Sequence, residues 1–236
     1  LDAGSMWGGV TIPVARHCKK IYAIDKTWES LRFLSLRAKQ DGFKNIHVAE
    51  GSISSLPFAD EYFDHIILNG VLEWIAMEEE VVLEQNWAKE MQKSISYAGK
   101  SDPEQAQLKG LKELCRVTKG DGSIYVAIEN RIGLQYFFGY PDDHVNIRFV
   151  SFLPRCLANF ITRRIKNHDY RTYLYSPSKL RNLLLQAGYK EVELYSSFPH
   201  YNIISRLVPF SVFDDSGAIS YNGDAPLDVS GRIKVF

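Results

Sequence analysis

Short apolar segments alternate with amphipathic segments along most of the chain. The segments with the length and composition of β-strands lie at residues 20–24, 45–49, 63–69, 123–128 and 189–197. Apolar residues at helical spacing occupy residues 29–40, 103–117 and 176–187. This alternation predicts an α/β fold with a doubly wound, mostly parallel sheet. In such a sheet the ligand lies beyond the carboxyl ends of the strands.

Several other segments carry weaker patterns. Residues 78–97 predict a long polar helix, and Lys119 to Gly122 predict a turn before the fifth strand. We expect one domain over residues 1–213, with a helical insertion over about 142–175 that covers the pocket as a lid. Residues 214–236 are rich in Gly, Asp and Ser and predict a loop or linker. Because the sequence starts inside its first strand, we expect it to be part of a longer protein.

Composition narrows the function classes. The 236 residues carry a formal net charge of zero, which gives no electrostatic reason to expect nucleic acid as a partner. The three cysteines are Cys18, Cys115 and Cys156, and their spacing fits neither a metal site nor a disulfide framework. We expect a reducing, cytoplasmic location and no bound metal. No apolar run is long enough to cross a membrane.

The opening residues carry the strongest candidate site. A buried strand ends near Ala3, a turn with Gly4 follows, and a short helix begins near Val10. Such a turn lets a ligand approach the backbone, and the start of a helix attracts anionic or polar groups. Asp25 ends the next strand, 21 residues after Gly4, where an acid typically binds ribose hydroxyls.

The spacing of the glycines argues against two common nucleotide sites. A dinucleotide site needs G-x-G-x-x-G, but here Met6 stands where the middle glycine belongs. A phosphate-binding loop needs Lys-Ser or Lys-Thr after its last glycine, and neither follows Gly9. An ordinary strand-to-helix turn of another α/β protein stays open as an alternative.

Several motifs in order resemble the class I S-adenosylmethionine-dependent methyltransferases. The glycine turn and Asp25 are similar to the first two motifs of that family. Leu56-Pro57-Phe58, Phe63-Asp64 and the segment 69–74 resemble its next signatures, and residues 113–128 and 175–195 resemble its later segments. Residues 129–144 resemble a segment of bacterial methyltransferases that are encoded beside glycosyltransferases. The resemblance implies S-adenosyl-L-methionine as the cofactor and a role in polysaccharide biosynthesis.

The resemblance also implies a set of binding residues. Gly4, Ser5 and Gly8 would face the methionine part of the cofactor, and Asp25 the ribose. The full set of expected cofactor-binding residues is Asp2, Gly4, Ser5, Met6, Gly8, Asp25, Lys26, Ser52, Ile53, Asn69, Gly70 and Leu72. Ser52 stands where the family usually has an acid, and Met6 would crowd the methionine end of the cofactor. Both departures are compatible with a weak binder.

Transfer of a methyl group to a neutral hydroxyl benefits from a general base. We expect His144 in this role, paired with Asp143 or Asp142, and His200 as the second candidate. The acceptor would be a small molecule or a glycan, and the basic, aromatic segment after residue 145 would allow peripheral contact with a membrane. Two other functions stay open: a module that binds the cofactor and regulates a fused or partner enzyme, such as a glycosyltransferase, and an NAD-dependent enzyme.

Overall fold

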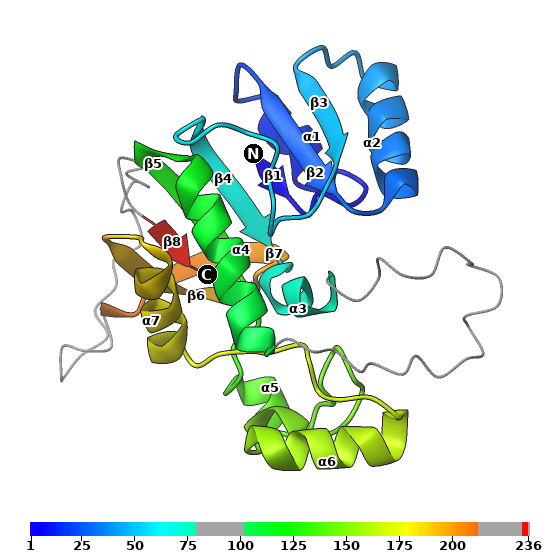
Figure 1. Ribbon diagram of the computed structural model, residues 1–236, viewed down its shortest axis with the longest axis vertical. Coiled ribbons are helices and arrows are strands. Elements are labelled where there is room, and N and C mark those ends of the chain that lie inside the picture. Colours follow the sequence, from blue (N-terminus) through cyan, green and yellow to red (C-terminus); the bar gives the residue numbers. More distant parts are fainter. Residues whose placement is uncertain (79–101, 212–232, 236) are drawn as a thin grey trace.

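The computed structural model describes residues 1–78, 102–211 and 233–235. Within them, eight strands form one sheet in the order β3-β2-β1-β4-β5-β8-β6-β7 (Figure 1). All paired strands run parallel except β6 and β7, which form an antiparallel hairpin. The strands are β1 (Asp2–Ala3), β2 (Ile21–Asp25), β3 (Ile46–Glu50), β4 (Phe63–Asn69), β5 (Thr118–Ala127), β6 (Val192–His200), β7 (Ile203–Pro209) and β8 (Ile233–Val235). The predicted doubly wound α/β fold is confirmed.

Helices connect these strands and cover the sheet. In Figure 1, α4 crosses one face of the sheet with α7 beside it, while α5 and α6 lie together beyond the end of α4. The helices are α1 (Thr11–Ala15), α2 (Trp28–Gln40), η1 (Leu72–Trp74), α3 (Ile75–Glu78), α4 (Pro103–Val117), α5 (Leu134–Phe137), η3 (Val150–Phe152), α6 (Arg155–Lys166) and α7 (Pro177–Ala187). None of the helices in the described part of the chain has the length and apolar character needed to cross a membrane.

The core sits between the central strands and the helices that pack on them. Ile24, Leu68 and Val126 come from three different strands and are fully buried, as expected for a parallel sheet covered on both faces. Leu111 and Leu114 are fully buried on the inner face of α4. Each such side chain contributes about 1.5–3 kcal/mol through removal of its apolar surface from water.

Local sequence signals set the ends of the long helices. Asp102 precedes α4 in an extended conformation and Pro103 is its first residue, where the missing N–H costs nothing. Proline also begins α7 at Pro177, and Gly188 ends that helix in the left-handed conformation, with φ of 112°. Both helices therefore begin and end where the sequence predicts.

The predicted turn at Lys119 to Gly122 is wrong, because these residues belong to β5. Thr118 pairs with Phe63 on β4, and a register shift follows between Phe63 and His65. The Lys119 ammonium donates a 2.6 Å hydrogen bond to Asp64, which ties the first part of β5 to β4. In this register Lys119 to Gly122 lie opposite the single residue Asp64, so the turn preference of Gly and Asp is expressed as a bulge within β5.

The prediction for the end of the sequence also needs correction. Ile233–Val235 is a strand that pairs with both β5 and β6, so residues 214–236 are not all loop or linker. The strand predicted at residues 189–197 forms at Val192–His200, and its partner β7 was not predicted at all. The polar helix predicted over residues 78–97 lies almost entirely outside the described residues.

The expected helical insertion is present as η3 and α6. Arg131 anchors it, because its guanidinium donates hydrogen bonds to the carbonyl oxygens of Ser151 and Leu153. Helix α6 lies away from the sheet in Figure 1. Of residues 142–175, only Tyr175 lines either of the two clefts described below, so the insertion does not cover the site in the way expected of a lid.

Candidate active site

A cleft of about 420 Å³ lies at the carboxyl ends of β1 to β4. Its walls are mainly apolar, and the side chain of Asp25 supplies a carboxylate. Residues that line it are Gly4, Met6, Ile24, Asp25, Lys26, Thr27, Gly51, Ile53, Gly70, Val71, Trp74 and Met77. The volume and the mixture of apolar walls with a few polar groups are typical of small-molecule and cofactor sites.

The glycine turn forms the floor of this cleft. Gly4 has a φ of 82°, and a Cβ at this position would lie 2.5 Å from a methyl group of Val71. The N–H groups of Gly4 and Ser5 both donate to the carbonyl oxygen of Ile24. These two donors are therefore used to join the turn to β2 and do not point at a ligand, contrary to the expectation from the sequence.

Asp25 holds the other side of the turn. Its carboxylate accepts one hydrogen bond from the Met6 N–H at 2.8 Å and another from the Thr27 N–H at 2.9 Å. A carboxylate has about four lone-pair sites, so further hydrogen bonds from ligand hydroxyls remain possible. Asp25 thus fixes the turn and also lines the cleft.

The structure brings six of the twelve expected cofactor residues to this cleft. They are Gly4, Met6, Asp25, Lys26, Ile53 and Gly70. Three others are buried beneath it: Asp2, Ser5 and Leu72. Asp2 accepts a hydrogen bond from the Thr11 hydroxyl, and burial raises the pKa of its carboxyl. These three residues support the floor of the cleft.

The last three expected residues make other contacts. Gly8 packs beneath Leu34 of α2, so close that a Cβ would lie 2.2 Å from a Leu34 methyl group. The Ser52 hydroxyl accepts a hydrogen bond from the Ser54 N–H at 3.2 Å. The Asn69 amide donates to the Asn202 side chain at 3.3 Å, across to the β6–β7 turn. None of the three lines the cleft.

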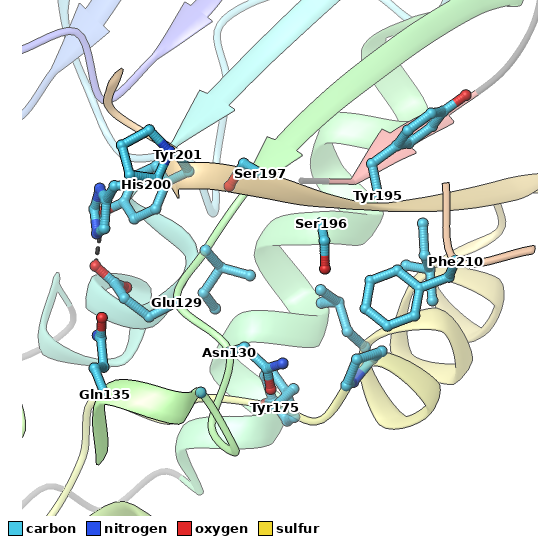
Figure 2. Close-up of a pocket in the computed structure, with 16 residues that line it drawn as sticks. Glu129, Asn130, Gln135, Tyr175, Tyr195, Ser196, Ser197, His200, Tyr201 and Phe210 are labelled. Carbon is cyan, nitrogen blue, oxygen red and sulfur yellow. Dashed lines mark hydrogen bonds between the residues drawn. The ribbon is translucent and has the colours of Figure 1, made fainter. Parts of the chain in front are cut away.

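A second pocket lies beyond the carboxyl end of β5, between α7 and the β6–β7 hairpin (Figure 2). Its volume is about 160 Å³. Tyr175, Leu180 and Phe210 give it an apolar side, whereas Glu129 and His200 give it a charged or titratable side. Asn130, Gln135, Ser196 and Ser197 add amide and hydroxyl groups to its lining.

Tyr201 lies where the two cavities adjoin. Its hydroxyl donates a 2.8 Å hydrogen bond to Glu129 in the second pocket. The same hydroxyl packs against Gly70, where a Cβ would lie only 2.7 Å from it, and Gly70 lines the first cleft. Figure 2 shows the rings of Tyr201 and His200 on the same side of the pocket as Glu129. The two cavities are therefore neighbours at Gly70 and Tyr201.

His144 is buried between two carboxylates. Its ring nitrogens lie 3.8 Å from Glu73 and 3.5 Å from Asp142, and its ring packs on Trp74 of the first cleft. Burial opposes the charged imidazolium, but the attraction of Asp142 and Glu73 is stronger and raises the pKa of His144 to about 10. Burial likewise raises the pKa of Glu73. The two carboxylates therefore favour the imidazolium form of His144, which opposes a role as a general base.

The cluster of Glu73, Glu129 and His144 comes closest to a metal-ligand arrangement among the described residues. One ligand atom from each lies within 4.8 Å of the others. Histidine must be neutral to bind a metal, however, whereas this His144 is held in its charged form by carboxylates. The three groups form a cluster in which two carboxylates face an imidazole.

The other two expected catalytic residues, Asp143 and His200, have different surroundings from His144. Asp143 is not its partner; the Asp143 carboxylate accepts a 3.3 Å hydrogen bond from Tyr136 instead. His200 lines the second pocket. Sequence reasoning missed Glu129 and Tyr201 as site residues, although Glu129 directly follows the apolar run of β5, where parallel sheets place ligand-binding side chains.

Comparisons with known proteins agree with this architecture. Residues 1–86 match the family model described as "Methyltransferase domain". An S-adenosylmethionine-dependent methyltransferase of Methanosarcina mazei has 16% sequence identity and a TM-score of 0.52, with 83% of this chain and 79% of that chain aligned. A chain of the complex between the Haloferax volcanii Trm112 methyltransferase activator and its methyltransferase has 15% identity and a TM-score of 0.52.

The Haloferax alignment covers 86% of this chain, which spans 64% of the length of that chain. No curated protein matches the sequence. At these identities the solved structures show a shared fold, and the family model assigns the chemistry to the first part of the chain. The match of residues 1–86 to a methyltransferase domain implies an enzyme that uses S-adenosyl-L-methionine.

Proposed function

From the methyltransferase domain in residues 1–86, we propose that this protein transfers a methyl group from S-adenosyl-L-methionine to a small-molecule or glycan acceptor. The observation that carries the proposal is that the two cavities adjoin at Gly70 and Tyr201. Methyl transfer is an in-line displacement, so donor and acceptor must meet at one point. The Tyr201 hydroxyl touches both Gly70 and Glu129 at the junction where the two ligands would meet.

The cleft at β1 to β4 fits the donor. When bound, S-adenosyl-L-methionine supplies a methyl group that its positively charged sulfur already activates. Asp25 would accept hydrogen bonds from the ribose hydroxyls, since its carboxylate lines the cleft and keeps unused lone pairs. Ile24, Ile53 and Val71 provide an apolar surface suited to the adenine ring. The protein then contributes orientation and exclusion of water.

The pocket beyond β5 fits the acceptor. Glu129 would accept the proton that an acceptor hydroxyl loses, because it lines this pocket and one of its carboxylate oxygens has no hydrogen-bond partner among the residues that the structure describes. The Tyr201 hydroxyl holds the other oxygen in place. His200 lines the same pocket and would contact the acceptor. His144 would act as a positioning residue, since its charge fixes Glu73 and its ring supports Trp74.

Two features favour a glycan among small-molecule acceptors. Amides and hydroxyls alternate with the aromatic rings of Tyr175 and Phe210 in the pocket, which suits the hydroxyls and the apolar face of a sugar. Residues 129–144 also resemble bacterial methyltransferases that are encoded beside glycosyltransferases. We extend the proposal to a role in polysaccharide biosynthesis, with the domain joined or adjacent to a glycosyltransferase.

Calorimetry with S-adenosylhomocysteine tests the donor site. Wild-type protein should bind this product, and Asp25→Ala should weaken binding by about 10- to 100-fold, because a charge-assisted hydrogen bond contributes about 1.5–3 kcal/mol. Asp41→Ala is the matched control, since Asp41 is a half-exposed carboxylate at the end of α2. Equal binding by wild type and Asp25→Ala would show that the donor site is assigned wrongly.

Turnover on a panel of sugars and small hydroxyl compounds tests the acceptor site. Glu129→Gln should lower kcat by about 10²-fold or more while leaving S-adenosylhomocysteine affinity unchanged. A variant with full activity would remove Glu129 from the reaction. Binding of S-adenosylhomocysteine with no turnover on any acceptor would favour the second candidate below.

A module that binds the cofactor without efficient catalysis is the second candidate. Met6 supports it, because a non-glycine residue with a φ of 43° lines the donor cleft. Ser52 supports it too, since its hydroxyl is engaged by the Ser54 N–H and does not line the cleft. An NAD-dependent enzyme is the weakest candidate, and the same calorimetry with NAD separates it from the others.

A further inference from the structure

Helix α6 is turned with its larger apolar side chains toward solvent. Its buried residues are Ala158 and Thr162, and the Thr162 hydroxyl donates to the Ala158 carbonyl oxygen within the helix. Leu157, Phe160 and Arg164 follow one another at intervals of three and four residues and therefore share the opposite face. Leu157 is 49% exposed and Phe160 is 54% exposed. We propose that this outer face of α6 docks on a membrane surface that contains anionic lipids.

The charge around α6 matches such a surface. Between His144 and His168 the sequence contains five basic residues and no acidic residue, although the whole chain has a net charge of zero. These residues are Arg148, Arg155, Arg163, Arg164 and Lys166. Basic residues near the surface of an anionic leaflet are attracted to it. Arg163 pairs with Asp169 and Arg155 packs over the Tyr173 ring, so Arg148, Arg164 and Lys166 would supply most of this attraction.

Apolar and basic groups are interleaved on the outer face. The Arg164 guanidinium lies 4.9 Å from the centre of the Phe160 ring, so one helical turn presents an aromatic ring and a cation together. A helix that lies in the interface of a bilayer has this combination, with apolar side chains below the headgroups and basic ones among them. Exposed aromatics continue on α5 nearby, where Phe137 and its neighbour Phe138 are both largely exposed.

Other occupants fit this surface less well. A second copy of the chain would bring two identical basic surfaces together, and like charges across an interface repel. A nucleic acid would match the charge, but its phosphate backbone would not cover Leu157 and Phe160. A bilayer satisfies both the apolar and the basic side chains at once.

Sedimentation with vesicles tests the proposal on the whole chain. Wild-type protein should sediment with vesicles of phosphatidylcholine and phosphatidylglycerol, but not with phosphatidylcholine alone. Raising the salt from ~0.1 M to ~1 M, which shortens the Debye length from about 10 Å to about 3 Å, should weaken binding strongly. The double variant Leu157→Ser, Phe160→Ser should reduce partitioning by about tenfold or more.

Helix α2 offers a matched control. Phe33 and Leu36 are as exposed as Leu157 and Phe160, but their helix also carries Glu29 and its Arg37 pairs with Asp41, so Phe33→Ser with Leu36→Ser should leave partitioning within about twofold. Arg164→Glu with Lys166→Glu keeps the apolar face and should abolish the preference for anionic vesicles, which provides a second test if the serine variant does not fold.

Three outcomes would overturn the proposal. They are no binding of wild type to anionic vesicles, equal loss of binding in the α2 control, and concentration-dependent dimerisation that only the α6 variants abolish. Binding of S-adenosylhomocysteine should be unchanged in every α6 variant. Failure of membrane docking is thereby distinguished from failure of the proposed enzymatic function.

Discussion

The hydroxyl group of Tyr201 donates a 2.8 Å hydrogen bond to the carboxylate of Glu129 and at the same time packs against Gly70. Burial raises the pKa of Tyr201 well above its ordinary value, and the nearby Glu129 charge adds to this, so the hydroxyl keeps its proton and remains a donor. A single side chain thus orients the proposed base and lies beside the junction of the two cavities.

Tyr201→Phe should separate these two roles. The variant keeps the ring but loses the hydrogen bond, so Glu129 becomes less well oriented. We expect kcat/KM for the acceptor to fall by about tenfold, in line with a hydrogen bond of about 1.5 kcal/mol to a charged group. The affinity for S-adenosylhomocysteine should stay within about twofold. A variant with unchanged kinetics would show that Tyr201 is only a packing residue.

Gly4→Ala should damage both stability and donor binding. The new Cβ would lie 2.5 Å from Val71, and the backbone has a φ of 82° that alanine adopts with strain. We expect a loss of about 2–4 kcal/mol in the free energy of unfolding, measured by urea denaturation, and little binding of S-adenosylhomocysteine.

Gly42→Ala is the control for Gly4→Ala. Gly42 has a similar φ of 78°, but a Cβ there meets no atom within 4 Å. Its cost should be limited to the backbone strain, about 1–2 kcal/mol. If the free energy of unfolding falls by the same amount in both variants, the close contact between residue 4 and Val71 does not contribute to the loss of stability.

Met6→Gly should strengthen donor binding. Met6 holds a φ of 43° and is more than half exposed in the donor cleft, so glycine would remove strain as well as a side chain that crowds the cleft. We expect the affinity for S-adenosylhomocysteine to rise several-fold by calorimetry. Weaker binding in the variant would mean that the Met6 side chain contacts the ligand favourably.

The stability of the protein should fall as the pH rises above neutrality. The pKa of His144 is raised to about 10 in the folded protein, from about 6.5 when unfolded, so the folded state holds a proton that the unfolded state has lost. The stabilisation is fully present below about pH 6.5 and disappears as the pH approaches about 10. Urea denaturation across this range measures the loss.

His144→Gln provides the comparison for the pH series. The difference in unfolding free energy between wild type and this variant should be largest near pH 6 and should shrink steadily toward pH 10. A constant difference across the series would mean that His144 is neutral in the folded protein. In that case its role as a general base would need to be considered again.

Parts of the fold that depend on local signals could be predicted closely from the sequence. β4 contains the apolar run Ile66 to Leu68, and it forms at the predicted residues Phe63–Asn69. The helix starts at Pro103 and Pro177 are marked by proline after an Asp or Ser, although neither side chain makes a capping hydrogen bond. The apolar residues of β7 are interrupted by Ser205 and Arg206 and are largely exposed, so only pairing with β6 defines this strand.

The candidate site likewise contains contacts that could be predicted from the sequence and contacts that could not. The glycine turn and Asp25 are close in sequence, and one short βαβ unit brings them together, so their pairing could be predicted. Glu129 meets Tyr201 only because the β6–β7 hairpin folds over the end of β5. His144 meets Glu73 through the insertion, and its charged state depends on burial that no spacing rule contains.

Strand β8 lies between β5 and β6, so the hairpin joins the rest of the sheet through a third segment and not directly. The proposed donor cleft is lined by residues of the β1–β4 half, whereas the proposed acceptor pocket combines the end of β5 with α7 and the hairpin. Divergence in the hairpin away from Tyr201 and Asn202 can therefore reshape the proposed acceptor pocket while the lining of the donor cleft stays the same. Related chains of this architecture would be expected to retain one half of the sheet and to vary the other.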